Sequence, residues 1–79
     1  MKWKTIKSIY ISVFKEGCKF IYRWENRYTL IWFNDDGTKM FETDFDDGIM
    51  DGEDIMYDTD GGFASHTIMK KGKILYDLL

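Results

Sequence analysis

The sequence predicts an α+β domain in which one N-terminal amphipathic helix packs on a small, mostly antiparallel sheet of three to five strands. Two observations carry this prediction. Apolar residues first recur at helical spacing and then, beyond Gly17, alternate with the period of a β-strand. With 79 residues, the chain has room for one domain, residues 1–79, and an aromatic content of 18% supplies the bulky side chains that so short a chain needs for a core.

The helix is predicted over residues 3–16. Its polar positions Lys4, Ser8 and Ser12 share one side, and the opposite side carries Trp3, Ile6, Ile9, Tyr10, Val13 and Phe14. Gly17 then stands where a residue in the left-handed conformation commonly ends a helix. We therefore expect Trp3, Ile6 and Phe14 to lie beneath the domain, which leaves no apolar face for a membrane.

Two strands are predicted after Gly17. In residues 18–24, the apolar residues Cys18, Phe20, Tyr22 and Trp24 alternate with Lys19 and Arg23, so one face of this strand is apolar. Residues 28–33 are apolar on both faces, which suits a strand in the interior of the sheet.

A third strand is predicted over residues 39–46, after the turn sequence Asn34-Asp35-Asp36-Gly37. Its alternation places Phe41, Thr43 and Phe45 on one face and acidic residues on the other. If Trp32 pairs with Phe41, the aromatic residues of all three strands share one face, and we expect that face to receive the helix.

The remaining sequence is predicted in two parts. Residues 47–62 are expected to form a glycine-rich acidic loop that folds back on the sheet edge through residues 49–50 and 55–57. Residues 63–79 fit either a hairpin that turns at residues 70–73 or a helix with a stripe at Ile68, Gly72, Leu75 and Leu79. Glycine inside a helix costs about 1 kcal/mol relative to alanine, which favours the hairpin. The chain shows no internal repeat.

The net charge of −3 conceals a division along the chain. Residues 1–34 hold seven Lys or Arg and two Glu, whereas residues 35–66 hold eleven Asp or Glu and the single cation Lys39. Nine acids fall within residues 42–60 without an intervening Lys or Arg, and these are the candidate partner-binding residues: Glu42, Asp44, Asp46, Asp47, Asp51, Glu53, Asp54, Asp58 and Asp60. Such crowding destabilises a fold by self-repulsion and therefore invites an explanation.

The first explanation is an acidic docking surface for a basic protein partner, such as a nucleic-acid-binding enzyme. Carboxylates at alternate positions of one strand are spaced by roughly 6.5–7 Å, comparable to phosphates along a nucleic-acid strand. In size, acidity and lack of catalytic residues, the chain resembles the small inhibitors that phages and mobile elements use against host nucleic-acid enzymes, including DNA mimics and anti-CRISPR proteins. This resemblance is one of type and rests on no motif.

Two alternatives stand beside it. Residues 44–48 and 58–62 place carboxylates at alternate positions beside glycines, as calcium loops do, although neither continues with the ligands of an EF-hand. The acidic segment could instead only keep a structural domain soluble.

Other function classes find little support in the sequence. His66, the one histidine, adjoins Ser65 in sequence, but adjacency does not build a catalytic triad, so we expect no enzyme, no cofactor and no metal. Lys19 and Arg23 alternate with the neighbouring aromatic residues, which places them on the other face and argues against direct nucleic-acid binding. Cys18 has no partner for an intrachain disulfide, which suits the cytoplasm.

Overall fold

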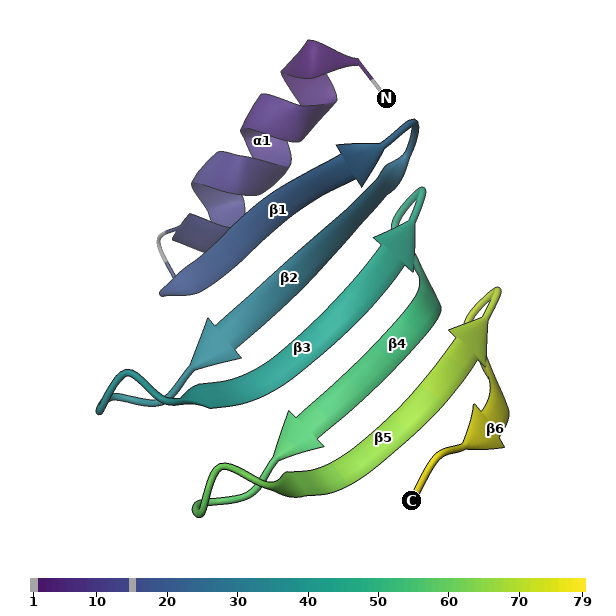
Figure 1. The fold of residues 1–79 in the computed structure, drawn as a ribbon. Helices are drawn as coiled ribbons and strands as arrows, with labels where there is room; N and C mark the ends of the chain where they lie inside the picture. The colour runs from purple at the N-terminus through teal and green to yellow at the C-terminus, as the bar shows by residue number, and fades with distance from the viewer. Residues whose placement is uncertain (1, 15) are drawn as a thin grey trace.

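The computed structural model describes residues 2–14 and 16–79. Helix α1 (Trp3–Phe14) is followed by six strands: β1 (Cys18–Trp24), β2 (Arg27–Phe33), β3 (Lys39–Asp46), β4 (Ile49–Tyr57), β5 (Phe63–Lys70) and β6 (Lys73–Asp77). Each strand pairs antiparallel with the next, so the sheet runs in chain order from β1 to β6 (Figure 1). The α+β class is confirmed.

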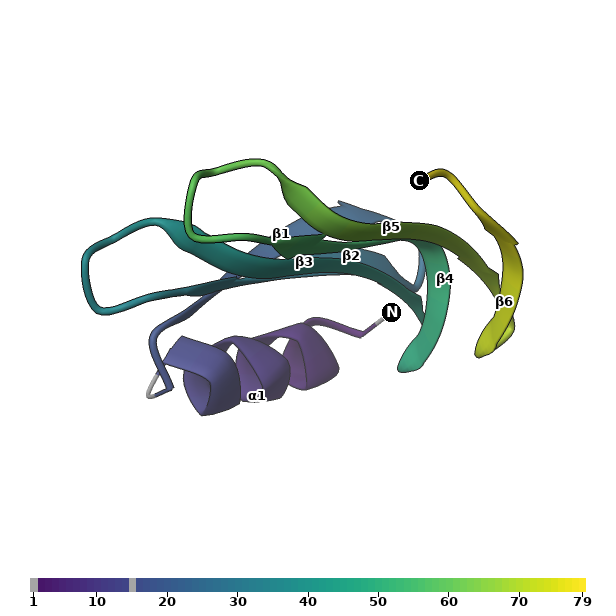
Figure 2. The same cartoon turned by 90° about the horizontal axis from the view of Figure 1, so that it is seen from below.

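Helix α1 lies along β1 on one face of the sheet (Figure 2). The buried core beneath it consists of Val13, Cys18, Tyr28 and Leu30, and Ile9, Phe20, Trp32 and Phe45 pack against this cluster. Trp32 pairs with Phe41, which is the register on which the expected common face depended, so Phe20, Tyr28, Trp32, Phe41 and Phe45 share the helix face. The hydrophobic cluster therefore lies between α1 and the β1–β3 end of the sheet.

The helix differs from its prediction in length and in orientation. It ends at Phe14 rather than at residue 16, and Gly17 has the positive φ of 72° expected of a terminating residue. Trp3 and Phe14 point away from the core and are exposed, so the expectation that both lie beneath the domain is wrong. The reason is that Val13 is buried in the core and Ile9 packs against it, whereas Trp3 and Phe14 lie on another side of the helix.

The prediction of three to five strands is also wrong, because the segment after Asp46 forms strand β4 rather than a loop. Asp47 and Gly48 adopt φ values of 53° and 83° and connect β3 to β4 directly. Positive φ at both central residues is the geometry of a type I′ hairpin turn, for which Asp-Gly is a favoured sequence. The dipeptide is thus a hairpin signal, and the two apolar islands belong to one strand.

The C-terminal hairpin is confirmed. Lys71 and Gly72 repeat the same turn geometry, with φ values of 51° and 83°, and connect β5 to β6. Strand β6 forms the far edge of the sheet, and all five of its residues are exposed (Figure 1).

The registers show that the chain does contain an internal repeat, with an interval of 24 residues. Trp32 pairs with Phe41, and 24 positions later Met56 pairs with Ser65. The register then shifts at the next residue of both strand pairs, at Phe33 and at Tyr57. The expectation of no repeat is therefore wrong.

The turns repeat at the same interval. The Asn34 N–H donates to the Thr38 carbonyl at 2.7 Å, and the Asp58 N–H donates to the Gly62 carbonyl at 2.9 Å. Residues 31–54 and 55–78 are thus two copies of one hairpin unit, and the identical residues are Ile31/Ile55, Asp36/Asp60, Gly37/Gly61, Thr43/Thr67 and Gly48/Gly72. The second copy of the unit extends the sheet at one edge and brings no helix with it. Strands β4 to β6 are therefore not covered by a second layer.

Candidate binding surface around the β3–β4 hairpin

Strand β3 carries its three acidic residues on the sheet face opposite α1. Phe45 packs against the core on the helix side, and Glu42, Asp44 and Asp46 alternate with the residues of that side. The register places Asp46 beside Arg27 and Glu42 beside Ile31. The predicted separation of the aromatic and acidic faces of this strand is thus confirmed.

Asp44 is held in a network that links four strands, β1 to β4. Its carboxylate accepts a hydrogen bond from the Thr29 hydroxyl at 2.7 Å and another from the Glu53 N–H at 3.0 Å. The Arg23 Nε donates in turn to the Thr29 hydroxyl oxygen at 3.1 Å, and Thr29 is fully buried. Opposite Asp44, Gly52 has a φ of 113°, and a Cβ built there would lie 2.7 Å from the Asp44 Oδ2. Asp44 therefore shapes the fold at a β4 irregularity that only glycine fits.

Arg27 gathers the acids at the end of the sheet where the tight turns meet. Its guanidinium contacts the Asp46 carboxylate at 3.2 Å and the Asp51 carboxylate at 3.1 Å. The Asp51 carboxylate also accepts the Lys71 N–H at 3.1 Å. This backbone hydrogen bond, together with Arg27, holds the pKa of Asp51 below its usual value. Asp51 thereby joins the β1–β2, β3–β4 and β5–β6 hairpins.

A trough of about 470 Å³ opens at this end of the sheet, lined by Asn26, Arg27, Asp46, Asp47, Ile49, Asp51, Lys70 and Lys71. Its lining includes three carboxylates and three cations, so its charge is mixed rather than purely negative. Its walls are stiffened by the Asp47 N–H, which donates to the Asn26 carbonyl at 2.8 Å.

Two further acids of the candidate set have partners on neighbouring residues. Glu42 forms an ion pair with Lys39 at 3.0 Å, which raises the pKa of Lys39, and accepts the Tyr57 hydroxyl at 3.3 Å. Burial and, next, the Glu42 charge raise the pKa of Tyr57. Glu53 meets the His66 Nε2 at 2.9 Å. His66 thus lies on the acidic face, beside a carboxylate.

Three further acids, Asp54, Asp58 and Asp60, lie apart from this face. Asp54 pairs in register with Thr43 and accepts its hydroxyl at 2.9 Å, which places it on the helix side of the sheet. Asp58 accepts the Asp60 and Gly62 N–H groups and so closes the β4–β5 turn at the opposite end of β4. Among the described residues of the candidate set, only Asp47 and Asp60 have carboxylates outside every hydrogen bond and ion pair.

The nine acids therefore do not form one cluster. Most of them lie on the sheet face opposite α1 or at the two ends of the strands, and Asp54 lies on the helix side. Arg27 and Lys39 pair with Asp46, Asp51 and Glu42, which leaves six carboxylates without a permanently charged partner: Asp44, Asp47, Glu53, Asp54, Asp58 and Asp60. Hydrogen bonds to backbone and hydroxyl groups fix Asp44, Asp54 and Asp58. The arrangement is a rigid, negatively charged surface with its accessible carboxylates at Asp47 and Glu53.

Sequence reasoning missed the residues that organise this surface. Arg27, Thr29 and Gly52 supply the ion pairs, the buried hydroxyl and the backbone conformation on which Asp44, Asp46 and Asp51 depend. One signal was available: a hairpin of known register would have placed Arg27 opposite Asp46.

The windows that resemble calcium loops form hairpin turns instead. In residues 58–62, the Asp58 carboxylate accepts two backbone N–H groups rather than pointing outward, and in residues 44–48 the Asp44 carboxylate is held by Thr29 and Glu53. Within residues 2–14 and 16–79, no three His, Cys, Asp or Glu side chains gather as a metal site would require. The same residues include no helix with the length and apolar character that a membrane crossing requires.

The chain matches no protein-family model, and neither a curated protein nor a solved structure shows significant similarity to it.

Proposed function

We propose that this protein is a non-enzymatic binding protein that docks the acidic surface of β3 and β4 on a basic partner protein. Its action is that of an inhibitor or modulator, and the partner class is a nucleic-acid-processing protein. A cytoplasmic setting suits the buried, unpaired thiol of Cys18.

One observation carries the proposal: Glu42, Asp44 and Asp46 stand at alternate positions of a single strand on the face that α1 leaves open. Alternate residues of a strand are spaced by roughly 6.5–7 Å, so a groove that binds successive phosphates would meet carboxylates at a similar interval. The hydrogen bonds of Asp44 and the ion pair of Asp46 fix these groups in advance, which lowers the entropy lost on binding.

The exposed carboxylates are the right ones to change, because Asp44 is part of the fold. Charge reversal at Asp44 would break two hydrogen bonds and confound a loss of binding with a loss of structure. We choose D47N/E53Q, since asparagine tolerates the positive φ of Asp47 and both changes keep the side-chain shape. The matched control is D35N/D77N, which removes two exposed charges from the β2–β3 turn and from β6.

The experiment captures partners from a lysate of the native host and identifies them by mass spectrometry at low and high salt. We expect a basic protein that is captured by the wild-type chain and by D35N/D77N, is lost with D47N/E53Q and is released by salt. The proposal is contradicted if capture does not depend on the salt concentration, or if D47N/E53Q captures the partner as well as the wild-type chain does.

A further inference from the structure

The outward side of α1 carries large apolar side chains that the domain does not use. Trp3 is 81% exposed, Phe14 67%, Tyr10 49% and Ile11 45%, whereas Val13 on the other side is buried in the core. Trp3, Tyr10 and Phe14 lie at helical spacing on one stripe, and the rings of Tyr10 and Phe14 stack with centroids 5.9 Å apart. Four such residues on one side of a 12-residue helix are too many for incidental exposure.

Lysines accompany this stripe, and acidic residues are missing from it. Lys7 lies between Trp3 and Tyr10 along the stripe, and Lys4 precedes Ile11 by two turns on the adjacent side. Residues 3–14 contain no Asp or Glu. The helix surface is therefore both apolar and cationic.

The two faces of the sheet also differ in charge: the cations of α1 are on one side and the acids of β3 on the other. The helix lies on one face of the sheet (Figure 2), and the alternation of β3 places Glu42, Asp44 and Asp46 on the other. A molecule of this kind has a preferred orientation on a negatively charged surface: helix toward it, β3 away from it.

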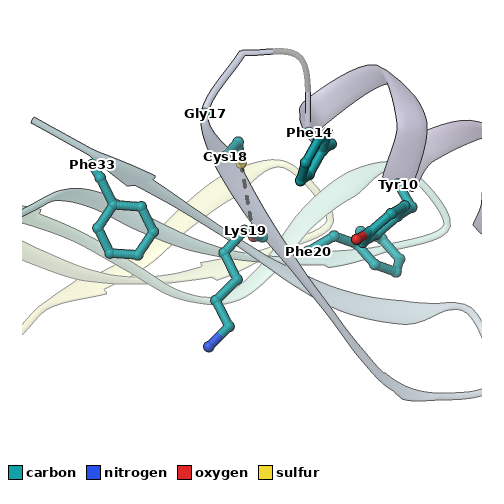
Figure 3. Close-up of a pocket in the computed structure, with 7 residues that line it drawn as sticks. All are labelled: Tyr10, Phe14, Gly17, Cys18, Lys19, Phe20 and Phe33. Atoms are coloured by element: carbon teal, nitrogen blue, oxygen red, sulfur yellow. Dashed lines mark hydrogen bonds between the residues drawn. The ribbon is translucent and has the colours of Figure 1, made fainter. Parts of the chain in front are cut away.

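An apolar trough continues the stripe toward the sheet. It has a volume of about 380 Å³, and four of its lining residues are aromatic: Tyr10, Phe14, Phe20 and Phe33. Figure 3 shows Tyr10, Phe14 and Phe20 at the seam between α1 and β1, with Phe33 on the other side of β1 from them and the Lys19 side chain extending away. Hydrocarbon suits such a trough better than a nucleic-acid backbone does, since a backbone requires a groove lined with cations.

We propose that α1 binds the surface of an anionic phospholipid bilayer, with Trp3, Tyr10, Ile11 and Phe14 inserted at the level of the headgroups and Lys4 and Lys7 contacting lipid phosphates. Tryptophan and tyrosine favour this interfacial zone, and amphipathic helices with lysines beside an aromatic side bind it in the plane of the membrane. The expectation of no membrane contact rested on Trp3 and Phe14 lying beneath the domain, which they do not.

The experiment is flotation of the full chain with vesicles of phosphatidylcholine alone or mixed equally with phosphatidylglycerol. We expect binding to the anionic vesicles and at least tenfold weaker binding to phosphatidylcholine alone. Each lysine near an anionic surface contributes about fivefold in affinity, so K4Q/K7Q should bind roughly 30-fold more weakly. Its control, K70Q/K73Q, removes two exposed lysines from β5 and β6 and should bind as the wild type does.

The apolar side is tested with W3S/F14S, which should bind at least tenfold more weakly, against I74S/L75S, which changes two similarly exposed apolar residues of β6 and should bind normally. Brominated acyl chains should quench the fluorescence of Trp3, so quenching should be lost in W3F. Equal binding of W3S/F14S and wild type overturns the proposal. An absence of vesicle binding also overturns the proposal. Sedimentation of W3S/F14S would then show whether the apolar side of α1 forms a dimer, and a gel shift with K4Q/K7Q would show whether the lysines bind single-stranded DNA.

Discussion

Replacing Gly52 by alanine should destabilise the domain far more than the same change at another glycine with positive φ. Gly52 has a φ of 113°, a region that side chains rarely adopt, and this strain costs about 1–3 kcal/mol. The new Cβ would also lie 2.7 Å from the Asp44 Oδ2 and 2.9 Å from the Asp44 Cβ. Asp44 must then move.

The cost of moving Asp44 follows from its contacts. Its carboxylate accepts hydrogen bonds from Thr29 at 2.7 Å and from the Glu53 N–H at 3.0 Å, and a hydrogen bond to a charged group contributes about 1.5–3 kcal/mol. Losing one of them in addition to the strain gives a total of about 3–6 kcal/mol for G52A.

The control is G61A, because Gly61 has a similar requirement for positive φ, at 85°, but open space around its Cβ position. It should cost only about 1–2 kcal/mol. Urea denaturation measures both values. A difference below about 0.5 kcal/mol between G52A and G61A would refute the steric argument, since that is the accuracy of additivity. The double variant D44A/G52A should cost less than the sum of its single changes, because the hydrogen bonds of the Asp44 carboxylate can be lost only once and alanine removes the contact at 2.7 Å, although the approach of the two Cβ atoms at 2.9 Å remains.

Two more predictions follow from shifted pKa values. Burial raises the pKa of the Cys18 thiol, so an aromatic disulfide reagent at pH 8 should label the native protein slowly and the urea-unfolded protein fast; equal rates would place the thiol at the surface. The Lys71 N–H and, to a smaller extent, Arg27 lower the pKa of Asp51. The ionised Asp51 carboxylate therefore stabilises the fold fully above the unfolded-state pKa of about 3.9, and this stabilisation is lost as pH falls through the lower pKa of the folded state. D51N should therefore be less stable than wild type at pH 7 in urea melts, and the gap should narrow by pH 3; a gap independent of pH would show that ionisation of Asp51 is unimportant.

The local patterns predicted the first half of the fold well, because each element there has one apolar side. The alternation in residues 18–24 and 39–46 and the pairing of Trp32 with Phe41 follow from the rule that one face must be buried. Strand β4 was missed because its sequence, Ile-Met-Asp-Gly-Glu-Asp-Ile-Met-Tyr, has no such alternation. The strand includes a glycine with positive φ, and register shifts interrupt its pairing with β3 and with β5.

The candidate surface was predictable in charge but not in geometry. Sequence spacing correctly separated Glu42, Asp44 and Asp46 from the aromatic face of the same strand. It could not reveal that Asp54 lies on the helix side, since that depends on the register between β3 and β4 across a bulge. The exposure of Trp3 was equally hidden, because the side of a helix that meets a sheet is decided by packing when both sides carry apolar residues.

The repeat leads to a last prediction, that the turns at residues 34–38 and 58–62 are interchangeable. Both turns close with the same pair of backbone hydrogen bonds, and Gly37 and Gly61 have φ values of 88° and 85°. The variant N34D/D35T/T38G gives the first turn the sequence of the second.

This exchange removes the hydrogen bonds that the exposed Thr38 hydroxyl makes with Asn34 and Asp36, at 3.0 and 2.6 Å, and gains the acceptor role that Asp58 has in its own turn. We therefore expect a loss of no more than about 1–2 kcal/mol in urea denaturation. The control G37A keeps the remaining sequence and should cost about as much through its φ alone. Loss of cooperative unfolding in the exchanged variant would show that the two turns are alike in backbone geometry but not in the sequence that each requires, and the 24-residue unit would then be a coincidence of register.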